Sequence, residues 1–410
     1  MSNSNNALLP STFNRLAWSN LAAQSAEQVA LAAAPIVAVL ALGAGEGETG
    51  ALQTALTLPF VLFAIPAGLL ADRLSRRRLM ASAEALRAVA LLAILAAISF
   101  GVLTLWLLAL LGFVAVCGTV VYSVAAPALV PSLVAPAALP AANARIELAR
   151  TVAFAGGPAL GGFLVGWIGA GPAFGCAAVL SVAAVVLLVG LFEPARQAAP
   201  RRHPLQEIRE GAAFVFRHPL LRPVFATQFI FNTAWFLMLA VFVPYGVHRL
   251  GLSASGVGTV LAMYGVGMVV GAALATRVMR WLPFGSVIGL GPVTGFVSSV
   301  VMALTTLYPT PVLAALSFFL LGVGPIIWVI STTTLRQSVT PPRLLGRISA
   351  INIMSYGARP LGAGLGTVVG GIWGAEACLY LAAAVFAAQA LVILLSQAVG
   401  LARQPEMVVE

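Results

Sequence analysis

The chain has 410 residues, of which 60% are hydrophobic and 8% are charged, and its mean hydropathy is +1.02. A water-facing surface normally carries charge on about a quarter to a third of its positions, so this composition excludes a soluble globular protein and indicates a chain solvated by lipid. The formal net charge is +10, and all 22 basic residues are arginines scattered between apolar runs. Because nucleic-acid binding requires a contiguous basic face, we expect no nucleic-acid partner.

Long apolar runs separated by short polar breaks predict twelve transmembrane helices. A helix needs about 20 apolar residues to cross the hydrocarbon core, so twelve spans account for nearly all of the hydrophobic residues. In chain order we expect spans at about 16–42, 50–71, 79–100, 103–126, 145–168, 172–192, 222–247, 254–278, 285–307, 311–335, 347–370 and 375–400. An even number of spans places both termini on the same side of the membrane.

The positions of the arginines give the orientation, because basic loops remain in the cytoplasm. With a cytoplasmic N-terminus, the interior loops contain nearly every loop arginine, and the exterior loops contain only Arg249. We therefore expect a multi-pass protein of the bacterial inner (plasma) membrane with both termini cytoplasmic. Residues Met1–Thr12 are polar and uncharged and show no signal-peptide pattern, so the first apolar stretch should remain as the first span.

The longest polar break, about Glu193–Leu221, divides the chain into two sets of six spans. Apolar residues at helical spacing within it predict an amphipathic helix on the inner leaflet, and an ordinary solvated linker is the alternative. The predicted organisation is a cytoplasmic N-terminus (1–15), an N-terminal six-helix bundle (16–192), a cytoplasmic linker (193–221), a C-terminal six-helix bundle (222–400) and a cytoplasmic tail (401–410).

The two halves share a weak internal repeat. Arg145 followed by Gly157–Gly162 recurs, 202 residues later, as Arg347 followed by Arg359–Gly364. Parallel repeats of six spans let a transporter build a central site between two bundles that rock against each other. We therefore expect an all-α membrane protein with about 12 transmembrane helices in two pseudo-symmetric six-helix bundles.

A charged motif follows the second span and reads Gly68-Leu-Leu-Ala-Asp72-Arg73-Leu-Ser-Arg76-Arg77-Arg78. Gly68 allows close helix approach, Asp72 is suited to face a helix N-terminus or a loop arginine, and the arginine run anchors the loop to the anionic leaflet. The motif resembles the inter-span signature GxLaDRxGRR of the major facilitator superfamily, with Ser75 where glycine is usual. The resemblance implies that Asp72 helps to latch the cytoplasmic side closed; the alternative is that the arginine run is only a topology signal.

The fifth span contains a second motif, in which Gly157 and Pro158 are followed by Gly161 and Gly162. Pro158 bends the helix and the glycines let a neighbouring helix pack closely. This motif resembles the GPxxGG signature that is associated with antiporters in the superfamily, which implies export; generic small-residue packing is the alternative.

Further stretches resemble the enterobactin-exporter and macrolide-efflux branch of that superfamily. These stretches are 127–134, 210–215, 346–348 and 359–362. The resemblance covers residues 13 to 400 and departs at Arg359, where a small or apolar residue is more usual.

Charges inside a membrane are costly and therefore indicate function. Glu27 lies about 11 residues into the first span, roughly 16 Å along the helix, and Gln24 and Gln28 share its face. We expect Glu27 to carry a coupling proton; a substrate-facing charge and a structural ion pair are the alternatives. Arg359, about a dozen residues into its span, is expected to pair with Glu27, to attract an anionic substrate group or to snorkel.

Two further acid–base pairs have a spacing of three residues, Glu84 with Arg87 and Glu147 with Arg150. We interpret both as local structural pairs near the cytoplasmic ends of their spans. The seventh span supplies candidate cavity residues that are apolar or aromatic, for which lipid-facing or packing roles are the alternative: Phe231, Trp235, Phe236, Met238, Phe242 and Tyr245.

No enzyme signature is present in the sequence, and neither the three cysteines nor the three histidines have metal-site spacing. We expect no catalytic residues, no metal and no cofactor. The expected protein is a monomeric secondary transporter that exports small amphipathic molecules, drug-like or siderophore-like, in exchange for protons and in contact with membrane lipids. An importer or facilitator of a small metabolite with the same fold is the alternative.

Overall fold

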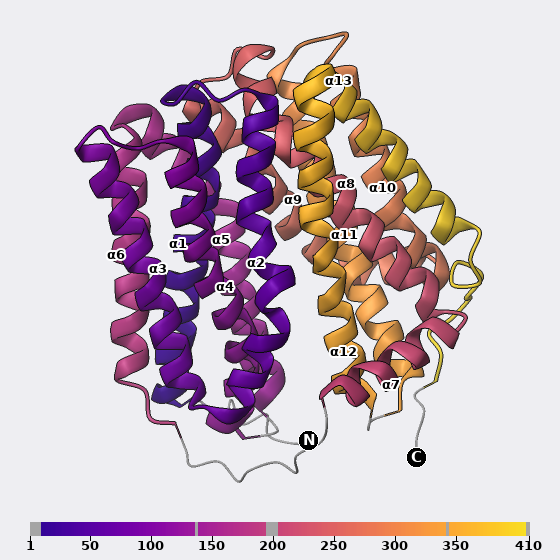
Figure 1. The fold of residues 1–410 in the computed structure, drawn as a ribbon. Helices are drawn as coiled ribbons and strands as arrows, with labels where there is room; N and C mark the ends of the chain where they lie inside the picture. Colours follow the sequence, from indigo (N-terminus) through magenta and orange to yellow (C-terminus); the bar gives the residue numbers. More distant parts are fainter. Residues whose placement is uncertain (1–9, 136–137, 194–203, 342–343, 407–410) are drawn as a thin grey trace. The chain divides into compact units, whose positions relative to one another are not determined.

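The computed structural model describes residues 10–135, 138–193, 204–341 and 344–406. Every regular element in these ranges is a helix, and eleven helices are long and apolar enough to cross a membrane (Figure 1). The predicted all-α membrane fold is therefore confirmed. The helices are α1 (Ser11–Leu40), α2 (Glu46–Arg73), α3 (Arg76–Ser99), α4 (Leu105–Leu133), α5 (Leu139–Trp167), α6 (Ala170–Val189), α7 (Pro204–Arg217), α8 (Leu221–His248), α9 (Ala254–Trp281), α10 (Phe284–Leu304), α11 (Pro311–Val339), α12 (Leu345–Met354), the short 3₁₀ helix η3 (Ser355–Gly357) and α13 (Ala358–Leu394).

Most of the last two predicted spans lies in α13, which has a break at Gly374; the first of these spans begins in α12 and the second extends beyond Leu394. This glycine has φ 81° and ψ 175°, a left-handed backbone conformation that side chains with a Cβ rarely adopt. The break falls between the predicted spans 347–370 and 375–400. One long helix with a break at Gly374 therefore corresponds to two predicted spans. This accounts for eleven long helices where twelve spans were predicted.

The described chain forms two compact units. Unit 1 comprises 1–34 and 62–198, and unit 2 comprises 35–61 and 199–410. The division falls within α1 and α2, so the second part of α1 and the first part of α2 pack with the C-terminal half of the sequence. A further boundary of the units, after 198, falls within the predicted linker (193–221), and the grouping departs from the order of the sequence only for 35–61. The predicted division into two six-helix bundles stays a prediction.

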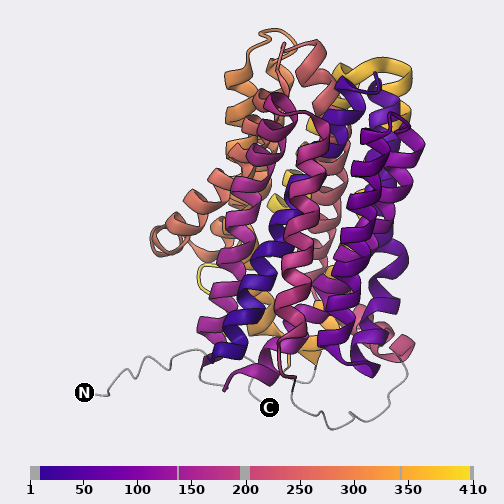
Figure 2. The same ribbon diagram turned by 90° about the vertical axis from the view of Figure 1, so that its left-hand side faces the viewer.

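In unit 1, α3 packs between α4 and α6, and the helices run roughly parallel to one another (Figure 2). Its core joins the beginning of α1 to the neighbouring helices through large buried side chains such as Phe13, Met80, Tyr122 and Leu188. Hydroxyl side chains begin α3 and α4: Ser75 accepts a hydrogen bond from the Arg78 amide, and Thr104 caps α4 in the same way. These caps satisfy backbone donors that would otherwise be orphaned.

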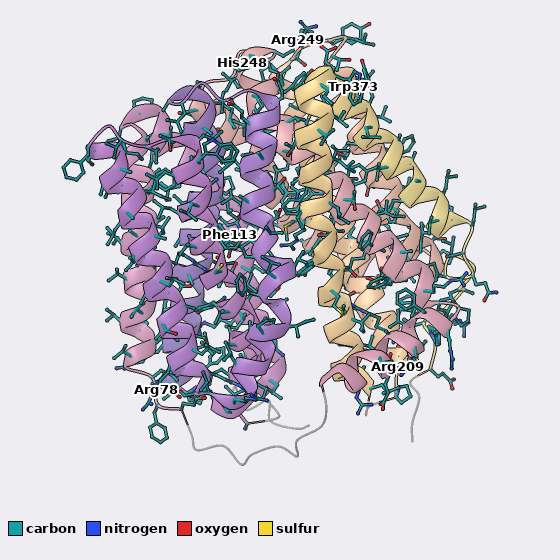
Figure 3. All side chains as sticks on the ribbon, in the orientation of Figure 1. Arg78, Phe113, Arg209, His248, Arg249 and Trp373 are labelled. Atoms are coloured by element: carbon teal, nitrogen blue, oxygen red, sulfur yellow. The ribbon has the colours of Figure 1, made fainter. Side chains whose placement is uncertain are left out.

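In unit 2, α8 packs against α13, and α11 packs against both α9 and α10. Aromatic side chains join these helices, as in the edge-to-face contact of Phe242 on α8 with Phe318 on α11. Figure 3 shows Arg209 at one end of unit 2 and Arg249 at the other. Arg249 forms an ion pair with Glu376 at 3.1 Å.

The amphipathic helix that the sequence predicts in the linker is observed as α7. Its Val215 is buried in a cluster with Leu221 and Val224 of α8 and Ile348 and Ile351 of α12. An ion pair between Glu210 of α7 and Arg347 of α12 lies beside this cluster. The apolar face of α7 is therefore covered by protein at this point, so the expectation that this face lies on the leaflet is wrong for Val215.

Candidate functional site

The polar face predicted on the first span is part of α1 in unit 1. Glu27 and Gln24 are half-buried, and Gln28 is buried. They lie one turn apart, so their polar groups share one side of the helix. An acidic side chain with two amides beside it therefore forms a polar centre in the middle part of α1.

The glycines of the second motif bring α5 against this polar face. A Cβ at Gly157 would overlap the Cβ of Gln28, and a Cβ at Gly161 would lie 2.8 Å from the carbonyl oxygen of Val29. Only glycine permits so close an approach of two helices. Pro158 and Gly162 are buried in the same helix. The structure therefore joins two features that the sequence shows separately, because the motif on α5 packs on the turn of α1 next to Glu27.

Arg359 lies in an aromatic cage in unit 2. Its guanidinium carbon is 3.9 Å from the ring centroid of Tyr356, 4.6 Å from that of Phe60 and 5.3 Å from that of Phe236. Its Nε donates a hydrogen bond of 3.3 Å to the Asn232 side-chain oxygen. Cation–π contacts and this bond stabilise a guanidinium that is only half-exposed. The predicted pairing of Arg359 with Glu27 stays a prediction.

The sequence identified Phe236 and Arg359 but not the other members of this cage. Tyr356 precedes Arg359 by three residues, a spacing that signals neighbours on a helix, whereas Phe60 comes from a distant part of the chain and carried no signal. Most aromatic candidates of the seventh span pack inside unit 2 instead. Trp235 stacks on Tyr264 with ring centroids 4.9 Å apart. Further packing or hydrogen-bonding contacts are made by Phe231, Phe242 and Tyr245, while Met238 is fully buried.

The charged motif after α2 is held by protein groups at the end of α6. The carboxylate of Glu193 accepts hydrogen bonds from the amides of Arg76 at 3.0 Å and Arg77 at 3.2 Å, and from the Ser75 hydroxyl. A carboxylate at a helix N-terminus is stabilised by the exposed amides and the helix dipole. Glu193 thus fills, at the start of α3, the kind of position that the sequence suggested for Asp72.

The arginines of the motif also make protein contacts. Arg77 donates to the Leu191 carbonyl at 2.9 Å, and Arg76 donates to the carbonyl of Ala128 on α4. Arg73 and Arg78 are exposed, and Figure 3 shows Arg78 at one end of unit 1. Two members of the run, Arg76 and Arg77, therefore hold the loop to protein, and the anchoring of the run to lipid stays a prediction.

The structure does not support the predicted role of Gly68 in this motif, and the predicted role of Asp72 stays a prediction. No heavy atom lies within 4 Å of a Cβ built at Gly68, so the expected close helix approach at this glycine is wrong for the described residues. The side chain of Asp72 lies outside the described part of the chain.

The two Glu–Arg pairs of the N-terminal half differ in their surroundings. Glu147 and Arg150 form the expected exposed pair, with two hydrogen bonds of 3.1 Å from Arg150 Nε to the carboxylate oxygens. Glu84 and Arg87 are instead 0% and 2% exposed and lie inside unit 1, joined at 3.1 Å. The predicted local pair is therefore confirmed, and the structure adds that it is buried inside the unit.

Among the described residues, no group of three or more His, Cys, Asp or Glu side chains is arranged to hold a metal ion. Cys117, Cys176 and Cys378 are free thiols. The polar elements of the two units are therefore the α1–α5 contact, the Arg359 cage, the Glu193 cap and the buried Glu84–Arg87 pair.

Comparison with known proteins assigns the family. The chain matches the Major Facilitator Superfamily over residues 16–363 and belongs to it. It is thus a multi-pass member of this superfamily of membrane transporters.

One curated relative is the uncharacterized MFS-type transporter y4rN of Sinorhizobium fredii. It is 30% identical over 252 residues, which cover 59% of this chain, and the chain spans 60% of that protein's length. The enterobactin-exporter and macrolide-efflux branch that the sequence resembles stays a prediction.

Solved structures share the fold at low sequence identity. The nucleoside transporter NupG superposes with a TM-score of 0.71 at 14% identity, covering 94% of this chain and 98% of its own. A bacterial homologue of the iron transporter ferroportin, in an inward-facing state, gives 0.72 at 17% identity, with 93% and 98% covered. A POT family transporter in complex with 5-aminolevulinic acid gives 0.77 at 11% identity, with 95% and 97% covered. At these identities the likeness concerns the fold alone.

Proposed function

We propose that this transporter exports small amphipathic molecules, drug-like or siderophore-like, by alternating access and in exchange for protons, with Glu27 as the proton carrier. The observation that carries the proposal is the polar face of α1, on which the GPxxGG motif of α5 is seated. An acid in the apolar part of a membrane protein is costly and is retained for a function. A carboxyl group that is desolvated in one state and hydrated in another binds and releases a proton as the states alternate.

The cage around Arg359 supports an amphipathic substrate. A guanidinium attracts an anionic group, and the rings of Phe60, Phe236 and Tyr356 offer an apolar surface beside it. Ligand sites are typically apolar with a few placed polar groups, and Arg359 with Asn232 supplies such groups here. In this proposal Arg359 orients the substrate, and Gln24 and Gln28 contribute hydrogen bonds next to Glu27.

The motif after α2 is proposed to serve as the cytoplasmic latch. The hydrogen bonds that the amides of Arg76 and Arg77 donate to Glu193 fix the loop within unit 1. The one-sided distribution of arginines supports cytoplasmic termini in the bacterial inner membrane, and we propose a monomer.

The test of this proposal is transport by the purified protein in proteoliposomes with an imposed pH gradient. The probes are a hydrophobic dye cation and a catecholate siderophore, each measured in gradient-driven accumulation and in counterflow. Glu27→Gln should abolish accumulation driven by the gradient while counterflow persists, because exchange of substrate needs no proton. Glu147→Gln, which changes an exposed acid of the same unit, is the matched control and should behave as the wild type.

Unchanged, uncoupler-sensitive accumulation by Glu27→Gln eliminates Glu27 as the carrier. Uptake of a sugar or other small metabolite that ignores the pH gradient, together with no movement of either probe, favours an importer or facilitator with this fold.

A further inference from the structure

A fully buried ion pair on α3 lies apart from the site described above. Glu84 and Arg87 are 0% and 2% exposed, and their closest charged atoms are 3.1 Å apart. A buried pair loses more hydration than a surface pair and is seldom the most stable choice for a helix interior. Charged residues within membrane helices therefore point to a functional role.

The two members of the pair differ in their hydrogen bonds to other groups. Arg87 donates hydrogen bonds of 2.8 Å to the Ala23 carbonyl on α1 and to the Thr119 hydroxyl on α4. Within the described residues, neither oxygen of the Glu84 carboxylate accepts a hydrogen bond, and the buried Ser181 hydroxyl on α6, which faces it, lies outside hydrogen-bond geometry. The negative charge of Glu84 is therefore held by the charge of Arg87 alone.

The groups that face Glu84 come from each helix packed against it. Arg87 on α3 is the charged group, Tyr122 on α4 is the titratable side chain that interacts with both members of the pair, and Ser181 is the polar group of α6. The Tyr122 hydroxyl forms a hydrogen bond of 3.2 Å with the Ser19 hydroxyl of α1. This bond joins two buried hydroxyl groups, one on α4 and one on α1.

The pair is bonded to the turn of α1 that carries Glu27. In an α-helix, the carbonyl of Ala23 accepts the amide of the residue four positions later, which is Glu27. Arg87 bonds this same carbonyl. A movement of Arg87 therefore acts directly on the backbone turn that positions Glu27.

We propose that Glu84 is a second proton-binding site, and that a proton bound there releases Arg87 from the ion pair and loosens its hold on the α1 turn that carries Glu27. A proton from water forms an O–H bond on the Glu84 carboxylate, which becomes neutral, and the pair is restored when that bond breaks. Arg87 stays charged throughout, since a guanidinium is not deprotonated in proteins. The protonated state leaves the Arg87 charge without a counter-ion, which favours a rearrangement of α3 against α1 and α4. This inference rests on the proposed proton coupling and adds to it.

The experiment is infrared difference spectroscopy of the full-length protein in lipid vesicles, exchanged between acidic and alkaline buffer without substrate. The wild type should show the carbonyl band of a carboxylic acid in an apolar environment in acidic buffer. Glu84→Gln should reduce this band by one carboxylic acid per protein. Glu147→Gln, an exposed acid with the same spacing to an arginine, should leave it unchanged. An unchanged apolar-acid band in Glu84→Gln overturns the proposal.

A folding defect of the single variant is separated by the double variant Glu84→Gln with Arg87→Gln, which removes both charges and leaves a neutral polar side chain at each position. This variant should fold and lack the Glu84 component of the band; a full band overturns the proposal. The spectra of Glu27→Gln separate the two acids. If Glu27→Gln still accumulates substrate but the Glu84 component of the band is present, the Glu84 site is supported and Glu27 is not the carrier. If Glu27→Gln loses coupling but the wild type shows no Glu84 component, the Glu84 site is overturned and the proposed role of Glu27 stands.

Discussion

Unit 1 contains two Glu–Arg pairs with the same spacing of three residues on a helix. On α3 the acid and the base are 0% and 2% exposed, whereas on α5 the side chains of Glu147 and Arg150 are 52% and 37% exposed. The exposed pair has its hydrogen bonds within the pair and is screened by solvent. The buried pair is bonded to two other helices. The comparison shows that a spacing of three residues is enough to form the ion pair, whereas burial determines which other groups the pair contacts.

The largest expected effect is on stability when the buried pair is broken. Arg87→Ala leaves the Glu84 charge without its counter-ion and should lower the free energy of unfolding by about 3–5 kcal/mol. Unfolding in mixed micelles with increasing denaturing detergent, followed by circular dichroism, measures this value. Glu84→Leu with Arg87→Met should restore stability to that of the wild type or above it, because an apolar pair of similar volume avoids desolvation. A loss below about 1 kcal/mol for Arg87→Ala would contradict the burial of the pair.

The next largest effect on stability is expected at two neighbouring glycines on α5, one buried against α1 and one exposed. Gly157→Ala forces a Cβ into Gln28 of α1 and should destabilise unit 1 by about 1–3 kcal/mol. Gly156→Ala meets no atom within 4 Å and should be neutral or stabilise the helix by up to about 1 kcal/mol. Thermal unfolding of both variants in detergent checks this, and equal effects would show that α5 does not approach α1 at this turn.

A half-buried histidine is intermediate between the buried Glu84–Arg87 pair and the exposed Glu147–Arg150 pair. His218 follows α7, outside the spans, and burial lowers its pKa, so the folded protein binds this proton less readily than the unfolded chain. Its Nδ1 accepts a hydrogen bond of 3.2 Å from the Leu220 amide, as in a neutral ring. Stability is therefore complete above the ordinary histidine pKa of about 6.5 and falls as the pH drops below it. His218→Gln should flatten this fall in stability by under about 1 kcal/mol.

The smallest effect is expected for the exposed pair. Glu147→Gln should change the free energy of unfolding by about 0–1 kcal/mol, and added salt should reduce even that. The measurement is the same detergent unfolding at low and high salt. A loss as large as that of Arg87→Ala would break the comparison, because an exposed pair would then act like a buried one.

The membrane fold was predictable because lipid imposes simple requirements. Spans need long apolar runs, and these runs are visible in the sequence without knowledge of their neighbours. The polar face around Glu27 and the glycines of α5 were also visible as local patterns. Their contact was not, because two helices 130 residues apart in sequence leave no mark of which turn meets which.

The candidate site was harder to predict where its parts come from distant helices. Arg359 stood out as a charge in an apolar run, but Phe60 and Asn232 look like ordinary residues of their own helices. Glu193 lies in the predicted linker, and no pattern in the sequence connects it with the start of α3. Such contacts depend on packing between helices, which is set by shape and not by local propensity.

By itself, the sequence determined that the chain crosses a membrane as a series of helices, where each helix lies, and which glycine and proline motifs it carries. Hydropathy and residue spacing are local properties of the chain, so they can be read without knowing which helices contact one another. Only the tertiary structure decided that Glu84 is fully buried while Glu147 is exposed, and that Glu193 caps α3. Burial and the choice of partners follow from the neighbours that each helix acquires on folding, and these neighbours determine whether a charge is screened by water or held by another charge.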